Sequence, residues 1–91
     1  MALIIETTKK VTVGTSAVNV STACRSFIVT NSSENAKVYL RENSADNVAC
    51  TPDNGFIILP GQTSACTLNA ECLSIVASAE CDVYFLYGRE D

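Results

Sequence analysis

The five cysteines are the side chains best suited to covalent or metal chemistry, and they stand at Cys24, Cys50, Cys66, Cys72 and Cys81. A cysteine nucleophile needs a neighbouring base, but the chain has no histidine to supply one. Zinc sites built on cysteine pairs use a Cys-x-x-Cys spacing, which this sequence lacks. We therefore expect reduced thiols that behave as small buried hydrophobic residues, and no metal site. Whether any two of them form a disulfide stays open.

Acidic residues offer two arrangements that could transfer protons or bind a cation. Glu80 and Asp82 flank Cys81 at strand spacing, so their carboxylates would share one face of a strand. A solvated strand edge accounts for the same pattern. Asp46 and Asp53 lie among polar residues in expected loops, but no calcium-binding loop with its central glycine surrounds them. We expect no enzymatic activity and no cofactor.

The three tyrosines, Tyr39, Tyr84 and Tyr87, point to binding rather than to catalysis. A tyrosine on the outer face of a sheet can stack on a sugar ring, because it combines a flat apolar surface with a polar tip. Tyrosine is also enriched at protein–protein interfaces. A third interpretation places these side chains at the rim of the protein's own core. All three interpretations stay open from the sequence.

Composition describes a folded, acidic chain. Its 91 residues suit one domain spanning residues 1–91, with 47% hydrophobic and 18% charged residues. The net charge is −4, and the six Lys and Arg residues form no basic stripe, so a nucleic-acid partner is not expected. The apolar run at the N-terminus ends at Ile5, and no stretch approaches the roughly 20 apolar residues of a membrane span. We expect synthesis in the cytoplasm and no membrane partner.

Alternation of apolar and polar residues recurs along the chain, and no segment keeps the helical period for three turns. Turn signals separate the alternating segments, most clearly Pro52–Gly55 and Pro60–Gly61. Residues 1–7 precede the regular pattern and fit an edge strand or an extended N-terminal arm. The predicted strands cover residues 8–13, 17–20, 24–30, 36–42, 48–50, 56–59, 64–68, 72–78 and 81–87.

Short strands at this spacing are typical of an all-β protein. We predict a single small β-sandwich or barrel of about eight antiparallel strands, jelly-roll-like in architecture. Its core should form from the apolar residues that share one face of each strand. The predicted core residues are Val11, Val13, Val18, Val20, Phe27, Val29, Val38, Leu40, Ile58, Leu73, Ile75, Val83 and Phe85.

The order of these segments is similar to that of a known group of proteins. The segments are Arg25-Ser-Phe-Ile-Val-Thr-Asn31, Lys37-Val-Tyr-Leu40, Gly55-Phe-Ile-Ile-Leu-Pro-Gly-Gln-Thr63, Leu73-Ser-Ile-Val-Ala-Ser78 and Asp82-Val-Tyr-Phe-Leu86. Over about residues 10–87 the chain resembles the small β-sandwich structural proteins of tailed bacteriophages. It departs from that group in its five cysteines.

The resemblance implies a non-enzymatic component of the virion, made in the host cytoplasm. The leading expectation is a capsid decoration or cement protein that binds the assembled shell through symmetric, multivalent protein contacts. A neck, tail or fibre component is the alternative within the virion. Outside the virion, a carbohydrate-binding or adhesin-type module is the alternative.

The expected partners are capsid or other virion proteins and further copies of this chain, with a trimer favoured. The contacts should come from the N-terminal arm, from the tyrosines and from the loop that contains Asn43 and Asp46. The candidate interface residues are Leu3, Ile4, Ile5, Tyr39, Asn43, Asp46, Tyr84 and Tyr87.

Overall fold

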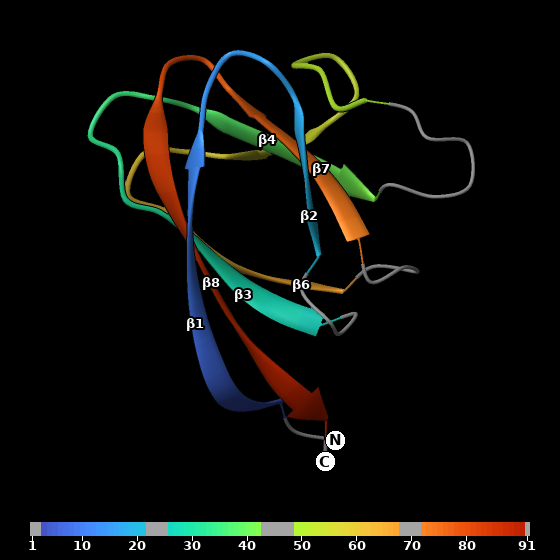
Figure 1. The fold of residues 1–91 in the computed structure, drawn as a ribbon. Coiled ribbons are helices and arrows are strands. Elements are labelled where there is room, and N and C mark those ends of the chain that lie inside the picture. The colour runs from blue at the N-terminus through green and yellow to red at the C-terminus, as the bar shows by residue number, and fades with distance from the viewer. Residues whose placement is uncertain (1–2, 22–25, 43–48, 68–71, 91) are drawn as a thin grey trace.

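Eight β-strands make up the regular structure of the computed structural model, which describes residues 3–21, 26–42, 49–67 and 72–90 (Figure 1). Each strand follows a segment in which apolar and polar residues alternate, and turn residues separate the strands. The strands are β1 (Leu3–Val13), β2 (Val18–Ser21), β3 (Ser26–Asn31), β4 (Val38–Glu42), β5 (Phe56–Ile58), β6 (Thr63–Thr67), β7 (Cys72–Ala77) and β8 (Cys81–Glu90).

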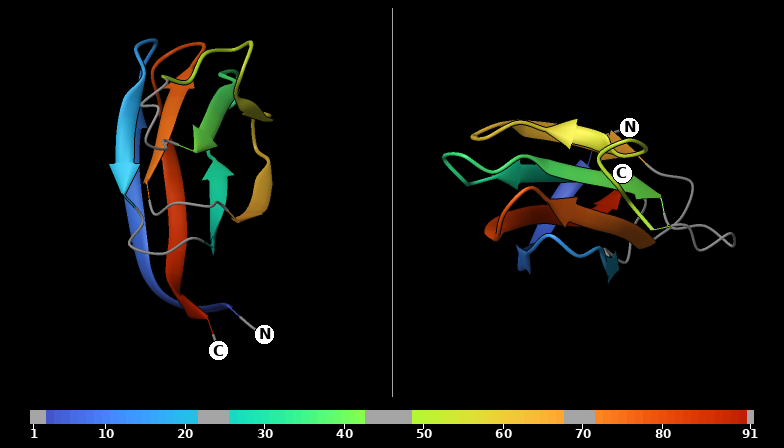
Figure 2. Two further views of the ribbon diagram at one scale, coloured as in Figure 1. Left: turned by 90° about the vertical axis from the view of Figure 1, so that its right-hand side faces the viewer. Right: turned by 90° about the horizontal axis from the view of Figure 1, so that it is seen from above.

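The strands form two four-stranded antiparallel sheets, which pack face to face as an open sandwich (Figure 2). We call the sheet with the order β1-β8-β3-β6 sheet A, and the sheet with the order β2-β7-β4-β5 sheet B. The first strand of the chain pairs with the last, β2 with β7, β3 with β6 and β4 with β5. This nested pairing is that of one long hairpin wrapped into two sheets, which is the jelly-roll arrangement. The predicted fold class is confirmed.

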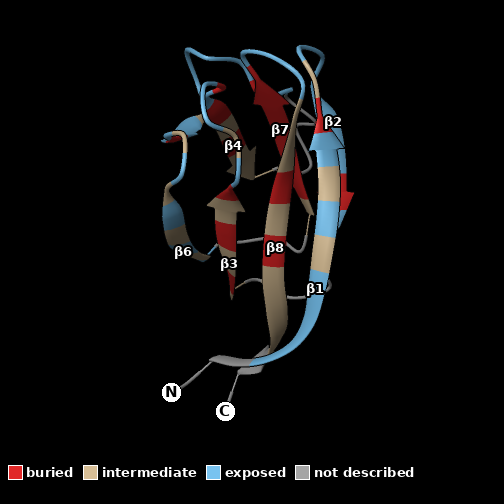
Figure 3. Cartoon of the chain, turned by 90° about the vertical axis from the view of Figure 1, so that its left-hand side faces the viewer, coloured by how far each residue is buried: buried red, intermediate tan, exposed pale blue. Residues whose placement is uncertain are grey.

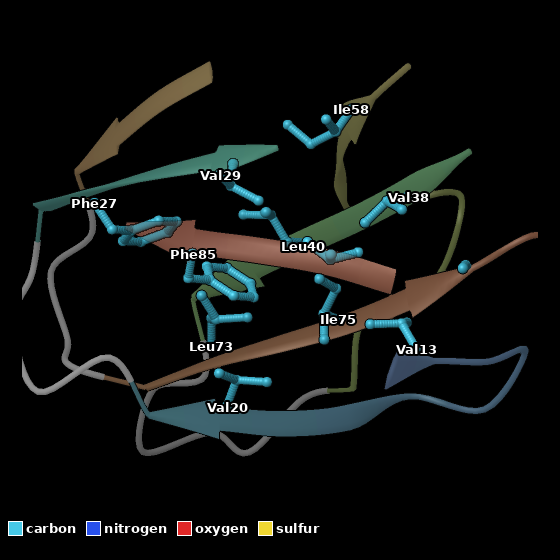
Figure 4. Packing of buried hydrophobic residues seen from close by; sticks show 12 residues of the cluster. Val13, Val20, Phe27, Val29, Val38, Leu40, Ile58, Leu73, Ile75 and Phe85 are labelled. Atoms are coloured by element: carbon cyan, nitrogen blue, oxygen red, sulfur yellow. The ribbon is translucent and has the colours of Figure 1, made fainter. Parts of the chain in front are cut away.

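The hydrophobic core lies between the sheets and is built from alternate residues of the strands (Figure 4). Phe27 of β3 and Phe85 of β8 meet edge to face, with ring centroids 5.6 Å apart. Eleven of the thirteen predicted core residues are buried. Val11 is only partly buried, at the margin of the core.

Val18 is a correction to the predicted core, because its side chain is 40% exposed. It is the first residue of β2, which is an edge strand and has a neighbour on one side only. Two positions further along the same strand, Val20 is 4% exposed. Alternation therefore identified the inward-facing side of β2 but not how far the core extends along it.

The predicted strand at residues 48–50 is also corrected. Ala49 and Cys50 belong to no strand, and residue 48 lies outside the described residues. The backbone N–H of Cys50 donates to the Ser74 hydroxyl over 2.9 Å instead of joining a strand ladder. An apolar run this short satisfies its backbone polar groups through side chains as readily as through a sheet.

Residues 3–7, for which the sequence left an edge strand or an arm open, lie in β1 at the edge of sheet A. They pair with β8 from Glu90 to Tyr87, with a bulge between Ile5 and Thr7. β3 pairs with β8 only along residues 83–86. The ends of β1 and β8 therefore continue as a two-stranded ribbon beyond the neighbouring strand (Figure 3).

Candidate functional site

A groove of about 400 Å³ opens on the side of the sandwich where β5 and β6 form the two sheet edges. Phe56 of β5 pairs with Leu40 of β4, so both side chains face the space between the sheets. Leu40 is 2% exposed, whereas Phe56 is 54% exposed. The residues that line the groove are Leu40, Arg41, Asn54, Phe56, Ala65, Cys66 and Thr67.

Exposed apolar side chains are concentrated at β5, the strand at one edge of this groove. Among the described side chains, three of the five exposed large hydrophobic residues lie in or next to β5, namely Phe56, Ile57 and Leu59. Of these three, Phe56 lines the groove, whereas Ile57 faces outward from sheet B. In the described part of the chain, β5 pairs only with β4, and β6 pairs only with β3. Each strand therefore has one edge on which no described strand lies, and the apolar groove runs between those two edges.

On the opposite side of the sandwich, the charged side chain of Lys9 bridges the edges of the two sheets. Lys9 of β1 pairs with Phe85, whose ring lies in the core, so Lys9 also faces the space between the sheets. Its Nζ donates a hydrogen bond over 3.2 Å to the backbone carbonyl of Ser21, the last residue of β2. An inward-pointing charge at a sheet edge discourages the addition of a further strand. The side formed by β1 and β2 is therefore protected against the addition of a further strand, whereas the side formed by β5 and β6 has no such charge in β5 or β6.

The outer face of sheet A is a second candidate surface. Tyr84 and Leu86 of β8 face outward beside Ile28 of β3, and all three are half-buried. The hydroxyl groups of Thr30 and Thr63 lie on the same face, with 2.9 Å between their side-chain oxygens. Protein interfaces are depleted of charge at their centre and enriched in tyrosine. The patch of Ile28, Tyr84 and Leu86 has that composition, and the exposed Lys10, which pairs with Tyr84, borders it.

The outer face of sheet B is covered by the chain itself. Ser74 and Val76 of β7 face outward there, but their side chains are 1% and 6% exposed. Cys50 lies against Ser74, because it is 3% exposed and its backbone N–H donates to the Ser74 hydroxyl. Gly55 lies so close that an added Cβ would be 2.6 Å from the Cys50 Sγ. This face is less available to a partner than the outer face of sheet A.

The three tyrosines do not share a surface. Tyr39 pairs with Ile57 on the outer face of sheet B. Tyr84 faces outward from sheet A, and Tyr87, three residues later on the same strand, packs against the core. All three are half-buried. The structure therefore offers no pair of tyrosines that could stack together on one sugar chain.

The remaining candidate interface residues lie at the β1–β8 ribbon or beyond the described chain. Leu3 and Ile4 pair with Glu90 and Arg89, and the side chain of Ile5 is 41% exposed. The candidates Asn43 and Asp46 lie outside the described residues. Within the structure, the candidate residues are therefore spread over the ribbon and both sheets.

The thiols of Cys50, Cys66 and Cys81 are free, and Cys24 lies outside the described residues. Burial raises the pKa of the Cys66 thiol. Burial and, to a lesser degree, the Asp82 carboxylate raise the pKa of Cys81. A thiol with a raised pKa carries less of the nucleophilic thiolate at neutral pH. The local environments of these two groups therefore disfavour a nucleophilic role.

Asp82, one of the two acidic residues considered for proton transfer, accepts a hydrogen bond from the Thr12 hydroxyl over 2.9 Å. Glu80 precedes β8 and lies in an exposed turn. Within the described ranges, no group of three or more His, Cys, Asp or Glu residues could hold a metal ion. The same ranges contain no helix long and apolar enough to cross a membrane.

The residues of the groove are absent from the candidate site residues that the sequence indicated. Phe56 was interpreted as part of an apolar strand, and Arg41 as the polar face of its own strand. An apolar run of only four residues, Phe56–Leu59, between two turn signals was the available clue, because so short a strand suits a sheet edge. β5 and β6 are edge strands because β5 pairs with β4 and β6 pairs with β3, both of which lie earlier in the chain. Alternation within each segment does not reveal these pairings.

No protein-family model, curated protein or solved structure matches this chain.

Proposed function

We propose that this chain is a non-enzymatic structural protein of a tailed bacteriophage virion, and most specifically a decoration or cement protein that binds the assembled capsid shell. The observation that carries the proposal is the outer face of sheet A, where Ile28, Tyr84 and Leu86 form an apolar patch beside the exposed Lys10, and no described segment covers this patch. The jelly-roll strand order supports it, because this architecture is frequent in viral capsid proteins.

Each contact between the protein and a shell can have a low affinity. Many copies of a small protein engage one repeating surface, so weak contacts add up through multivalency. The protein favours the assembled shell over its free subunits because only the assembled state offers the complete binding surface. The resemblance to small phage sandwich proteins gives the proposal its biological setting.

A pelleting assay tests the proposal with purified protein and empty shells of the phage that encodes it. We expect the wild-type chain to sediment with the shells at micromolar concentration. Leu86→Lys places a charge on the outer face of sheet A and should abolish co-sedimentation. Ile57→Lys makes the same type of change on the outer face of sheet B, where the exposed fraction of the side chain is 38%, and should leave binding intact. Wild-type protein that stays in the supernatant would overturn the capsid assignment.

The same assay with purified tails and fibres separates the alternatives within the virion. A carbohydrate-binding module is the second candidate function, now supported by a different observation from the tyrosines. The exposed Phe56 residue lines a groove that Arg41 and Asn54 also line. An apolar ring beside polar groups suits a sugar. Screening of immobilised glycans with wild-type and Phe56→Ala protein tests that candidate directly.

A further inference from the structure

We propose that the free edge of β6 is a self-association surface, at which two copies of this chain pair β6 against β6. The two strands run antiparallel about a two-fold axis at Ala65, which is the middle residue of β6. The two copies of sheet A then form one continuous eight-stranded sheet, because each contributes four strands. This inference does not depend on capsid binding.

The first support is that β6 lacks the features that normally protect a sheet edge. Edge strands carry charges, prolines or bulges, which prevent another strand from pairing. β1, at the other edge of sheet A, carries Lys9 and Lys10 and has a bulge between Ile5 and Thr7. β6 has no charged residue and no proline, and its register with β3 runs without a break.

The second support is the near-palindromic sequence of β6, Thr63-Ser-Ala-Cys-Thr67. An antiparallel pair centred on Ala65 places Thr63 opposite Thr67 of the second copy, and Ser64 opposite Cys66. The two alanines at the axis are small and let the backbones approach. Facing hydroxyls already stabilise the pairing with β3, where Ser26 and Thr67 have their side-chain oxygens 3.2 Å apart. The second copy repeats that chemistry on the free side.

The third support is the apolar groove beside this edge. A strand added to β6 extends sheet A along the side where the groove opens, with the inward-facing Ser64 and Cys66 of the second copy directed toward it. Phe56, at present 54% exposed, then has a partner surface. Covering an exposed aromatic ring contributes apolar burial to the backbone hydrogen bonds of the new strand pair.

Charge favours a second copy at this edge over other approaches. The chain carries a net charge of −4, so two copies repel each other on average. β6 itself is uncharged, and among the described residues that line the adjacent groove only Arg41 is charged. The two-fold arrangement gives a dimer, in contrast to the trimer favoured from the sequence, so the mass in solution separates the two.

Light scattering on a sizing column, from micromolar to millimolar concentration, tests the proposal with the wild-type chain and three variants. We expect the wild type to reach twice its chain mass of 9.7 kDa. Ala65→Lys and Ala65→Glu each place like charges directly opposite one another at the axis, so each alone should be monomeric. An equimolar mixture of the two should recover the double mass, because opposite charges then face each other and both variants must be folded to pair.

Thr8→Lys is the matched control, because Thr8 is exposed on the opposite edge strand of the same sheet. It should keep the wild-type mass. A wild-type monomer throughout the concentration range would overturn the proposal, as would a trimer or dimer that Ala65→Lys leaves intact. Amide hydrogen exchange gives a second measurement, in which the β6 amides should exchange more slowly in the wild type than in Ala65→Lys. Equal exchange would overturn pairing at this edge.

Discussion

Asn31 joins the two sheets by a hydrogen bond to Ile58. The side-chain Nδ2 of Asn31, at the end of β3, donates to the backbone carbonyl of Ile58, at the end of β5, over 3.1 Å. The same nitrogen donates to the Ala36 carbonyl over 2.8 Å, and the side-chain oxygen accepts from the Ser33 N–H over 3.0 Å. Asn31 is fully buried. One amide therefore satisfies three backbone groups on the groove side of the sandwich.

Asn31→Ala should lower the free energy of unfolding by about 2–4 kcal/mol, because buried backbone groups lose their partners without gaining water. Asn35→Ala is the matched control, since Asn35 lies in the same turn but is exposed, and we expect a change within about 0.5 kcal/mol. Urea denaturation measures both values. Equal losses in the two variants would contradict the role assigned to the Asn31 amide.

Gly55 allows residues 50–55 to lie against sheet B. A Cβ at this position would be 2.6 Å from the Cys50 Sγ and 2.8 Å from the Tyr39 Cβ. Gly55→Ala should therefore destabilise the protein by about 1–3 kcal/mol, as overpacking does. Gly14→Ala is the control, because an added Cβ there meets nothing within 4 Å. A thermal melt that shows equal shifts for both variants would contradict this packing.

The strands and the core were largely predictable because they depend on local alternation. Val38 and Leu40 alternate with polar neighbours, and the structure buries both. Asn31 directly follows the predicted strand 24–30, at a position where asparagine is typical of a turn. Its burial follows from a contact with β5, which is distant in sequence. A local pattern cannot show that such an acceptor will be nearby.

The groove could not be predicted from the alternation within single segments, because it also depends on contacts between distant segments. Its two sides come from β5 and β6, which belong to different sheets, and its exposure depends on both being edge strands. Alternation gives Phe56 an inward direction, because it lies two residues before the buried Ile58. Whether a neighbouring strand then covers Phe56 depends on the strand order. Edge positions follow from the full topology and not from any single segment.

Val18 and Val20 test the extent of the core along β2. Val20→Ala should cost about 2 kcal/mol, because the side chain is 4% exposed and its methyl groups leave a cavity. Val18→Ala makes the same chemical change at a side chain that is 40% exposed, and should cost less than about 0.5 kcal/mol. Denaturant midpoints give both values. A larger loss for Val18→Ala would show that the core extends to the start of β2.

Cys50 should make the stability of the protein fall at alkaline pH. Burial raises the pKa of this thiol above its ordinary value of 9.0, and the Arg41 guanidinium offsets only part of that increase. In the unfolded chain the thiol ionises first, so the unfolded state holds fewer protons than the folded state above about pH 9. The free energy of unfolding is therefore unaffected by this group at lower pH and decreases as the pH rises through the folded-state pKa.

Urea midpoints from about pH 6 to about pH 11, measured for the wild type and Cys50→Ala, isolate the contribution of this thiol. Below about pH 8 the urea midpoints of the two proteins should change with pH in parallel. The midpoint of Cys50→Ala should be lower throughout this range, because a buried side chain is truncated. Above about pH 9 the decline should be shallower in Cys50→Ala. It should not vanish, since burial also raises the pKa of Cys66 and Cys81. Curves that stay parallel into the alkaline range would show that Cys50 ionises equally readily in both states.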